Sequence, residues 1–208
     1  MRYFLVIMIG LISIQASFAD QRPRALELLN QLKSTTSLAA EFEQTVRGEG
    51  NRIISESKGK FVFKRPGRFR WDYVAPFEQM IMADGDTIWM YDIDLEQISV
   101  RQQKAALSGT PALLLSGGVD IAKHFFIEFE MTDRGGVEWV RLLPKQDEAT
   151  FTKVMLGFKD GTLNQMKMID HFNQITLFVF SKITLNADVD DTLFLFVPPK
   201  GVDVIRAE

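Results

Sequence analysis

Residues 58–73, KGKFVFKRPGRFRWDY, place two strand-like segments on either side of a proline–glycine turn. Side chains alternate between the two faces of a β-strand, and here every second residue is apolar. The residues expected to share one face are Phe61 and Phe63 before the turn and Phe69, Trp71 and Tyr73 after it. This stretch predicts a β-hairpin with one buried aromatic face.

Arg65 follows the same alternation and would lie on the aromatic face, whereas Lys64 would point away. A buried arginine has to find acceptors, because an unpaired buried charge is strongly destabilising. Alternatively, Pro66 breaks the strand and leaves Arg65 in solvent at the strand end. The residues alone leave both interpretations open.

Similar alternation continues along most of the chain, interrupted by hairpin turns at residues 84–86 and at Asp160-Gly161. The pattern predicts a single antiparallel meander, and hence a mainly β fold. Strands are expected at residues 40–47, 61–63, 69–73, 80–82, 88–91, 98–100, 125–131, 137–143, 154–158, 162–168, 174–185 and 193–196.

Helical patterns occur at the start and in the middle of the mature chain. Leucines at three-residue spacing behind Pro23 predict one amphipathic helix over residues 23–33. Residues 102–124 predict two short helices joined by glycines, with Thr110 as a cap and Pro111 at the first helical position.

The first 19 residues have the three parts of a secretory signal: a basic start, an apolar run and Ser17-Phe18-Ala19 before the cleavage site. The run is shorter than the roughly 20 residues that span a bilayer. We expect cleavage after residue 19, export, and one soluble domain over residues 20–208.

Composition excludes several classes of function. The chain has 208 residues, a net charge of −3, two histidines and no cysteine. Nucleic-acid binding is not expected of a mildly acidic chain without a basic block. No catalytic motif or metal-ligand spacing occurs, so neither an enzyme nor a metal or other cofactor is predicted. The acidic cluster Asp188, Asp190 and Asp191 is interpreted as a solvated turn rather than a calcium loop.

A set of aromatic and methionine residues lies on the strands predicted in the first half of the chain. They could form an ordinary core, or line a cavity for an apolar ligand. The residues proposed for such a cavity are Phe42, Phe61, Phe63, Phe69, Trp71, Met80, Met82 and Trp89.

Five stretches together resemble the LolA family of periplasmic outer-membrane lipoprotein carriers. They are FEQ (42–44), KGKFVFKRPGRFRW (58–71), DGDTIWMY (84–91), GTPALLL (109–115) and FLFVPPKGV (194–202). Single motifs are weak, but their order and spacing are specific, and the resemblance covers essentially all of the mature chain.

The resemblance implies an incomplete antiparallel β-barrel with a lid of short helices over a hydrophobic cavity. It implies a periplasmic carrier that accepts acylated lipoproteins from the inner-membrane LolCDE transporter and delivers them to the outer-membrane acceptor LolB. Shuttling between two partners suggests a monomer. The family's lid-latching arginine falls on Arg65, and its lid helix on Pro111, Leu113, Leu114 and Leu115. Ala112 is smaller than the bulky residue that some members have there.

Two other classes remain open from the residues: a cell-envelope lipid-binding protein with different apolar cargo, and a periplasmic interaction module that carries nothing. For a carrier, we expect Arg65 to donate hydrogen bonds to carbonyls at the C-terminal end of the lid helix. Cargo would have to displace this closed state, which would keep binding reversible.

Overall fold

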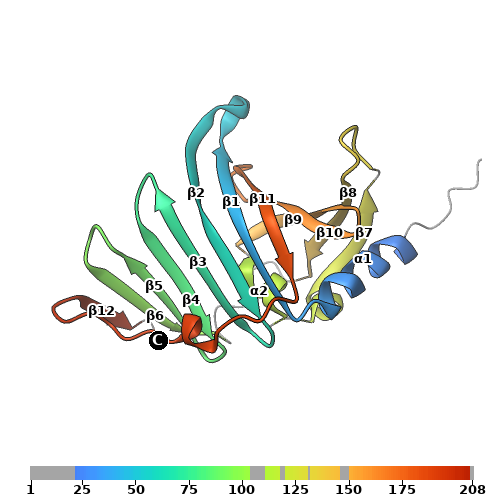
Figure 1. Cartoon of the computed structure of the whole chain (residues 1–208). Helices are drawn as coiled ribbons and strands as arrows, with labels where there is room; N and C mark the ends of the chain where they lie inside the picture. The colour runs from blue at the N-terminus through green and yellow to red at the C-terminus, as the bar shows by residue number, and fades with distance from the viewer. Residues whose placement is uncertain (1–21, 104–110, 118–119, 131, 146–149, 207–208) are drawn as a thin grey trace, which may run out of the picture.

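The computed structural model describes residues 22–103, 111–117, 120–130, 132–145 and 150–206. The expected signal segment, the Thr110 cap and Gly109 and Gly118 lie outside these residues. The described residues form one twelve-stranded sheet with short helices at its mouth (Figure 1). The helices are α1 (Arg22–Ser34), α2 (Pro111–Ser116) and α3 (Ile121–His124), with 3-10 turns η1 (Glu49–Asn51) and η2 (Asp191–Phe194).

The strands follow the expected alternation, and most are longer than expected because they extend beyond their apolar run. Those expected at residues 125–131, 137–143 and 174–185 instead agree with the observed bounds to within one residue. The observed strands are β1 (Ser37–Arg47), β2 (Ile53–Lys64), β3 (Arg68–Ala75), β4 (Gln79–Asp84), β5 (Thr87–Asp92), β6 (Gln97–Gln102), β7 (Phe125–Glu130), β8 (Glu138–Pro144), β9 (Phe151–Lys159), β10 (Thr162–Asp170), β11 (Ile175–Leu185) and β12 (Asp203–Arg206).

The strand order is β12-β6-β5-β4-β3-β2-β1-β11-β10-β9-β8-β7. Two antiparallel meanders, β1 to β6 and β7 to β11, are joined where β11 returns to pair with β1. The helical segment lies between β6 and β7 in the chain, and β6 and β7 do not pair with each other. The two edge strands of the sheet are β12 and β7, so the described residues form an open, incomplete barrel, as predicted.

Two expectations about the C-terminal region are wrong. Residues 193–196 are not a strand: the chain forms η2, which begins after Asp190, whose carboxylate accepts the backbone N–H of Thr192 at 2.9 Å. Such capping favours a helical turn over an extended segment. The sheet is also not wholly antiparallel, because β12 pairs with β6 in parallel.

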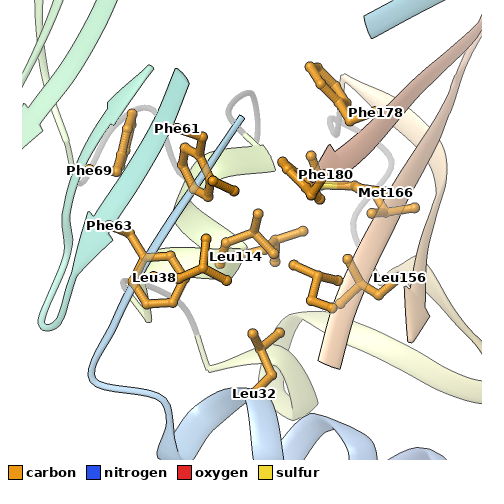
Figure 2. Close-up of a cluster of buried hydrophobic side chains, with 14 of the residues drawn as sticks. Leu32, Leu38, Phe61, Phe63, Phe69, Leu114, Leu156, Met166, Phe178 and Phe180 are labelled. Atoms are coloured by element: carbon orange, nitrogen blue, oxygen red, sulfur yellow. The ribbon is translucent and has the colours of Figure 1, made fainter. Parts of the chain in front are cut away.

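The main core lies on the concave face of the sheet, where α1 and α2 pack. Figure 2 shows Leu114 of α2 between aromatic side chains of β2 and β3 on one side and residues of β9 to β11 on the other. Leu32 of α1 completes the cluster from below. The helices therefore fill the hollow of the sheet.

A bidentate ion pair fixes α1 to the second meander. Arg24 donates from Nε and Nη2 to the two carboxylate oxygens of Glu138 on β8, at 2.7 and 2.6 Å. These hydrogen bonds hold the pKa of Glu138 below its ordinary value. The contribution to stability is then complete above the unfolded-state pKa of about 4.3, and is lost as the pH falls through the lower folded-state pKa.

Glu138→Gln is expected to lower the free energy of unfolding by about 1 kcal/mol at pH 7. The loss should be smaller at pH 3 than at pH 7, because more of the wild-type Glu138 carboxylate is protonated at the lower pH. Urea unfolding at both pH values measures this. Glu27→Gln is the control, because Glu27 meets the same Arg24 from an exposed position in the next turn of α1 and should cost less. A loss for Glu138→Gln that stayed constant with pH would contradict the assignment.

Candidate functional site

The apolar cluster brings together five of the eight residues predicted to line a cavity: Phe42, Phe61, Phe63, Phe69 and Trp71, each no more than 4% exposed. They come from β1, β2 and β3 and share the concave face. Their rings are in contact, with the Phe61 and Trp71 centroids 4.3 Å apart and those of Phe42 and Trp71 5.1 Å apart. This wall of the hollow is continuous and aromatic.

The opposite side of the same cluster was not predicted. Phe178 and Phe180 of β11 contact Trp71 at centroid distances of 5.0 and 6.2 Å. Phe178 and Phe180 are two residues apart in the strand expected at residues 174–185, and this alternation was the sequence signal that they share a face. The pairing of β11 with β1, which brings them to Phe42, is a non-local contact that alternation does not reveal.

Three predicted cavity residues, Met80, Met82 and Trp89, lie on the other face, so their assignment to the cavity is wrong. The register pairs Trp71 with Ile81, and Met82 with Trp89. Ile81 packs against the concave cluster, so its neighbours Met80 and Met82 must face the convex side. There the C-terminal segment covers them: η2 packs on β3 and β4, and the rings of Phe196 and Trp89 lie 5.4 Å apart.

The α2 helix fills the hollow of the sheet. Leu114 is 6% exposed and Leu115 is fully buried, and both belong to the main cluster. The side chains of Pro111 and Leu113, also expected in the lid, lie outside the described part of the structure. The two described leucines occupy space that an apolar ligand would need.

Arg65 joins α2 to the rest of the molecule. Its Nη2 donates to the carbonyl of Leu115 at 2.7 Å and to that of Leu32 at 3.0 Å. Its Nε donates to the Thr35 carbonyl at 2.7 Å. One guanidinium therefore connects the C-terminal ends of α2 and α1. The contact with α1 was not expected from the sequence.

Both alternatives weighed for Arg65 were partly right. The strand does end, since β2 stops at Lys64, but Arg65 stays on the concave side, with its guanidinium 5.2 Å from the centre of the Phe63 ring. Lys64 points away and donates to the Val189 carbonyl on the convex side. Burial lowers the pKa of Arg65, but arginine stays protonated at physiological pH because its ordinary pKa exceeds about 12.

The acceptors of Arg65 explain why a half-buried cation is tolerated there. The last carbonyls of a helix have no partner within the helix and carry its negative dipole end. Arg65 satisfies such carbonyls in two helices. The backbone N–H of Gly67 donates to the following carbonyl of α2, that of Ser116, at 3.0 Å. The β2–β3 turn as a whole therefore caps α2.

Gly117 leaves room for this arrangement. It follows α2 with φ of +80°, and a Cβ placed on it would lie 1.9 Å from Nη1 of Arg65. A side chain at residue 117 is therefore incompatible with the observed position of the guanidinium.

A pocket of about 470 Å³ opens beside Arg65, between α1, α2 and α3. Leu26, Leu29 and Leu32 form its α1 wall, and Leu114 and Ile121 lie opposite. α2 thus does not pack completely against α1. The pocket adjoins the hydrogen bond from Arg65 to α2, so movement of α2 would enlarge it.

The remaining polar clusters have structural roles. In the acidic cluster near the C-terminus, Asp190 caps η2, and Asp191 lies between Lys64 and Arg68, 3.0 Å from the latter. Arg70 pairs with Asp72 of its own strand at 2.8 Å. No group of three histidine, aspartate or glutamate side chains that could hold a metal occurs in the described ranges. None of the described helices is both long enough and apolar enough to cross a membrane.

The comparisons of this sequence with known proteins agree with one another. The family model for the outer membrane lipoprotein carrier protein LolA matches residues 33–197. The outer-membrane lipoprotein carrier protein of Nitrosospira multiformis is 43% identical over 175 residues, which cover 84% of each chain. That of Cupriavidus pinatubonensis is 38% identical over 208 residues, which cover 96% of this chain and 98% of the relative.

Solved structures share the fold at low sequence identity. A LolA superfamily protein from Nitrosomonas europaea has a TM-score of 0.51 at 11% identity, covering 83% of this chain and 97% of that chain. An uncharacterized conserved protein from Thermus thermophilus has a TM-score of 0.56 at 14% identity, covering 88% and 99%.

Proposed function

Because the chain belongs to the LolA family of outer-membrane lipoprotein carriers, whose members are carriers and not enzymes, we propose that it shields the acyl chains of lipoproteins in the concave face of its sheet. The observation that supports this most is the helix α2, which fills an aromatic hollow and is held there by Arg65. Arg65 then acts as the lid latch, and Pro111, Leu113, Leu114 and Leu115 form the lid.

A carrier of acyl chains has to release what it binds. Each buried CH₂ contributes roughly 0.8 kcal/mol, so several long chains in an open hollow would bind almost irreversibly. In the closed state, Leu114 and Leu115 occupy the hollow instead. Cargo must displace them, and the cost of opening is subtracted from its affinity.

The chemistry of the latch suits this task. Its acceptors are backbone carbonyls, which a change of side chains in the lid would not remove. The charge-assisted hydrogen bonds are worth about 1.5–3 kcal/mol each, enough to favour closure and small enough to be overcome by acyl-chain burial. The lid therefore opens only when apolar cargo replaces it.

We further propose the route that the family resemblance implies. The mature chain, a single domain from residue 20, works as a monomer in the periplasm. It accepts lipoprotein from the inner-membrane LolCDE transporter and passes it to LolB at the outer membrane. The opening between the two edge strands, β12 and β7, would be the entry path, because the sheet is not closed there.

The cargo can be identified directly. The mature protein would be purified from its own periplasm without detergent, and its bound material analysed by mass spectrometry. We expect acylated protein. Free lipid or fatty acid alone would instead favour a lipid-binding protein with other cargo. Failure both to retain ligand and to bind an apolar fluorescent probe would contradict any cavity and favour an interaction module.

A further inference from the structure

Trp71 carries a buried polar group without a partner. The side chain is 4% exposed, and its indole N–H has no hydrogen-bond acceptor among the described residues. The other two tryptophans differ: Trp139 donates to Asp133 at 3.0 Å, and Trp89 approaches Asp84 at 3.4 Å. Buried polar groups are almost always paired, because an unmade hydrogen bond leaves the desolvation cost uncompensated.

Within the described part of the chain, the surroundings of Trp71 offer no acceptor to its indole N–H. Its ring packs against the rings of Phe61, Phe178 and Phe42, at centroid distances of 4.3, 5.0 and 5.1 Å. A polar pair on this face, Tyr73 and Gln44, is bonded within itself: the Tyr73 hydroxyl donates to Gln44 Oε1 at 2.7 Å. A phenylalanine would fill the same apolar environment without the unpaired N–H.

An acceptor can arrive with the cargo. The inference here depends on the proposed function, in which acyl chains enter this hollow. Acyl chains attached through ester or amide links each bring one carbonyl oxygen, a strong acceptor at the end of an otherwise apolar chain. We propose that the indole N–H of Trp71 donates a hydrogen bond to an acyl carbonyl of the bound cargo.

This hydrogen bond would stabilise the loaded state, whereas the hydrogen bonds of Arg65 stabilise the closed, empty state. The closed, empty state satisfies Arg65 and leaves the Trp71 N–H unpaired; the loaded state breaks the contacts of Arg65 and pairs Trp71. The hydrogen bond would also give the hollow a preference for acyl over plain alkyl chains and set where the head of one chain lies.

The test compares a diacylglycerol with the dialkyl ether of the same chain length, which has no carbonyl. Both compete with an apolar fluorescent probe for the wild type and for Trp71→Phe. The wild type should prefer the diacyl ligand by about 3- to 10-fold more than Trp71→Phe does. The ratio of the two ligand affinities is compared between the wild type and Trp71→Phe, and this comparison cancels the intrinsic difference between the ligands. Trp89→Phe, which changes a tryptophan on the convex face, should discriminate as the wild type does.

A spectroscopic measurement does not depend on the folding of Trp71→Phe. The indole ¹H–¹⁵N resonance of Trp71, assigned by elimination from Trp89→Phe and Trp139→Phe, should move downfield with the diacyl ligand and not with the ether. The same diacyl preference in the wild type and in Trp71→Phe, with no difference in that resonance between the two ligands, would overturn the hydrogen bond and leave the carrier function intact. If neither ligand displaced the probe, the proposed acyl cavity would fail, and this inference with it.

Discussion

Arg65→Leu is expected to hold lipoprotein more tightly than the wild type and to deliver at least tenfold less of it. The substitution removes donors to Leu115, Leu32 and Thr35, so the closed state rises in free energy while the loaded, open state keeps its acyl contacts. Leucine fits the apolar surroundings, so the fold should persist. At about 1.4 kcal/mol per tenfold, the loss of even one charge-assisted hydrogen bond is sufficient.

A reconstituted transfer assay measures this effect as the lipoprotein retained on the carrier and the lipoprotein passed to acceptor membranes. Arg65→Lys is the matched variant, because it keeps the charge but lacks the planar fork that reaches two helices at once. It should restore transfer only partly. Unchanged retention and normal handover by Arg65→Leu would rule out the latch.

Gly117→Ala should give the same defect without touching the arginine. The added Cβ would lie 1.9 Å from Nη1 of Arg65, so the guanidinium has to leave its position. The expected result is raised retention and transfer reduced several-fold, in the same assay. Arg65→Leu and Gly117→Ala should not add in the double variant, because without the guanidinium the clash is absent.

Gly136→Ala is the control for backbone strain. Gly136 has φ of +79°, almost that of Gly117, and a Cβ there would meet nothing within 4 Å. Both alanines carry the cost of a left-handed conformation, roughly 1–2 kcal/mol, but only Gly117→Ala should change transfer. An equal defect in both variants, or full additivity with Arg65→Leu, would show that residue 117 acts through the backbone alone.

The sequence allowed the aromatic wall to be predicted but not its full extent. Alternation places Phe61 and Phe63, and Phe69 and Trp71, on one face within their own strands. It fails at β4, where Met80, Ile81, Met82 and Ala83 are all apolar. Both faces of β4 are covered, one by the core and the other by the C-terminal segment, so apolarity does not indicate which face is concave.

Non-local contacts explain the other differences. The parallel pairing of β12 with β6 and the folding of η2 against β3 depend on packing between distant parts of the chain. The contact of Arg65 with α1 also depends on such packing. The sequence indicated a buried cation that needs carbonyls, and the resemblance pointed to α2. Only the structure places Leu32 and Thr35 beside the same guanidinium.

The most direct test of the account is release of newly made lipoprotein from spheroplasts by the mature protein. We predict a soluble one-to-one complex of lipoprotein and carrier in the medium, formed also by Arg65→Leu but then poorly passed to acceptor membranes. If the folded protein bound an apolar probe and yet left all lipoprotein in the membrane, the account of this chain as a lipoprotein carrier would be contradicted.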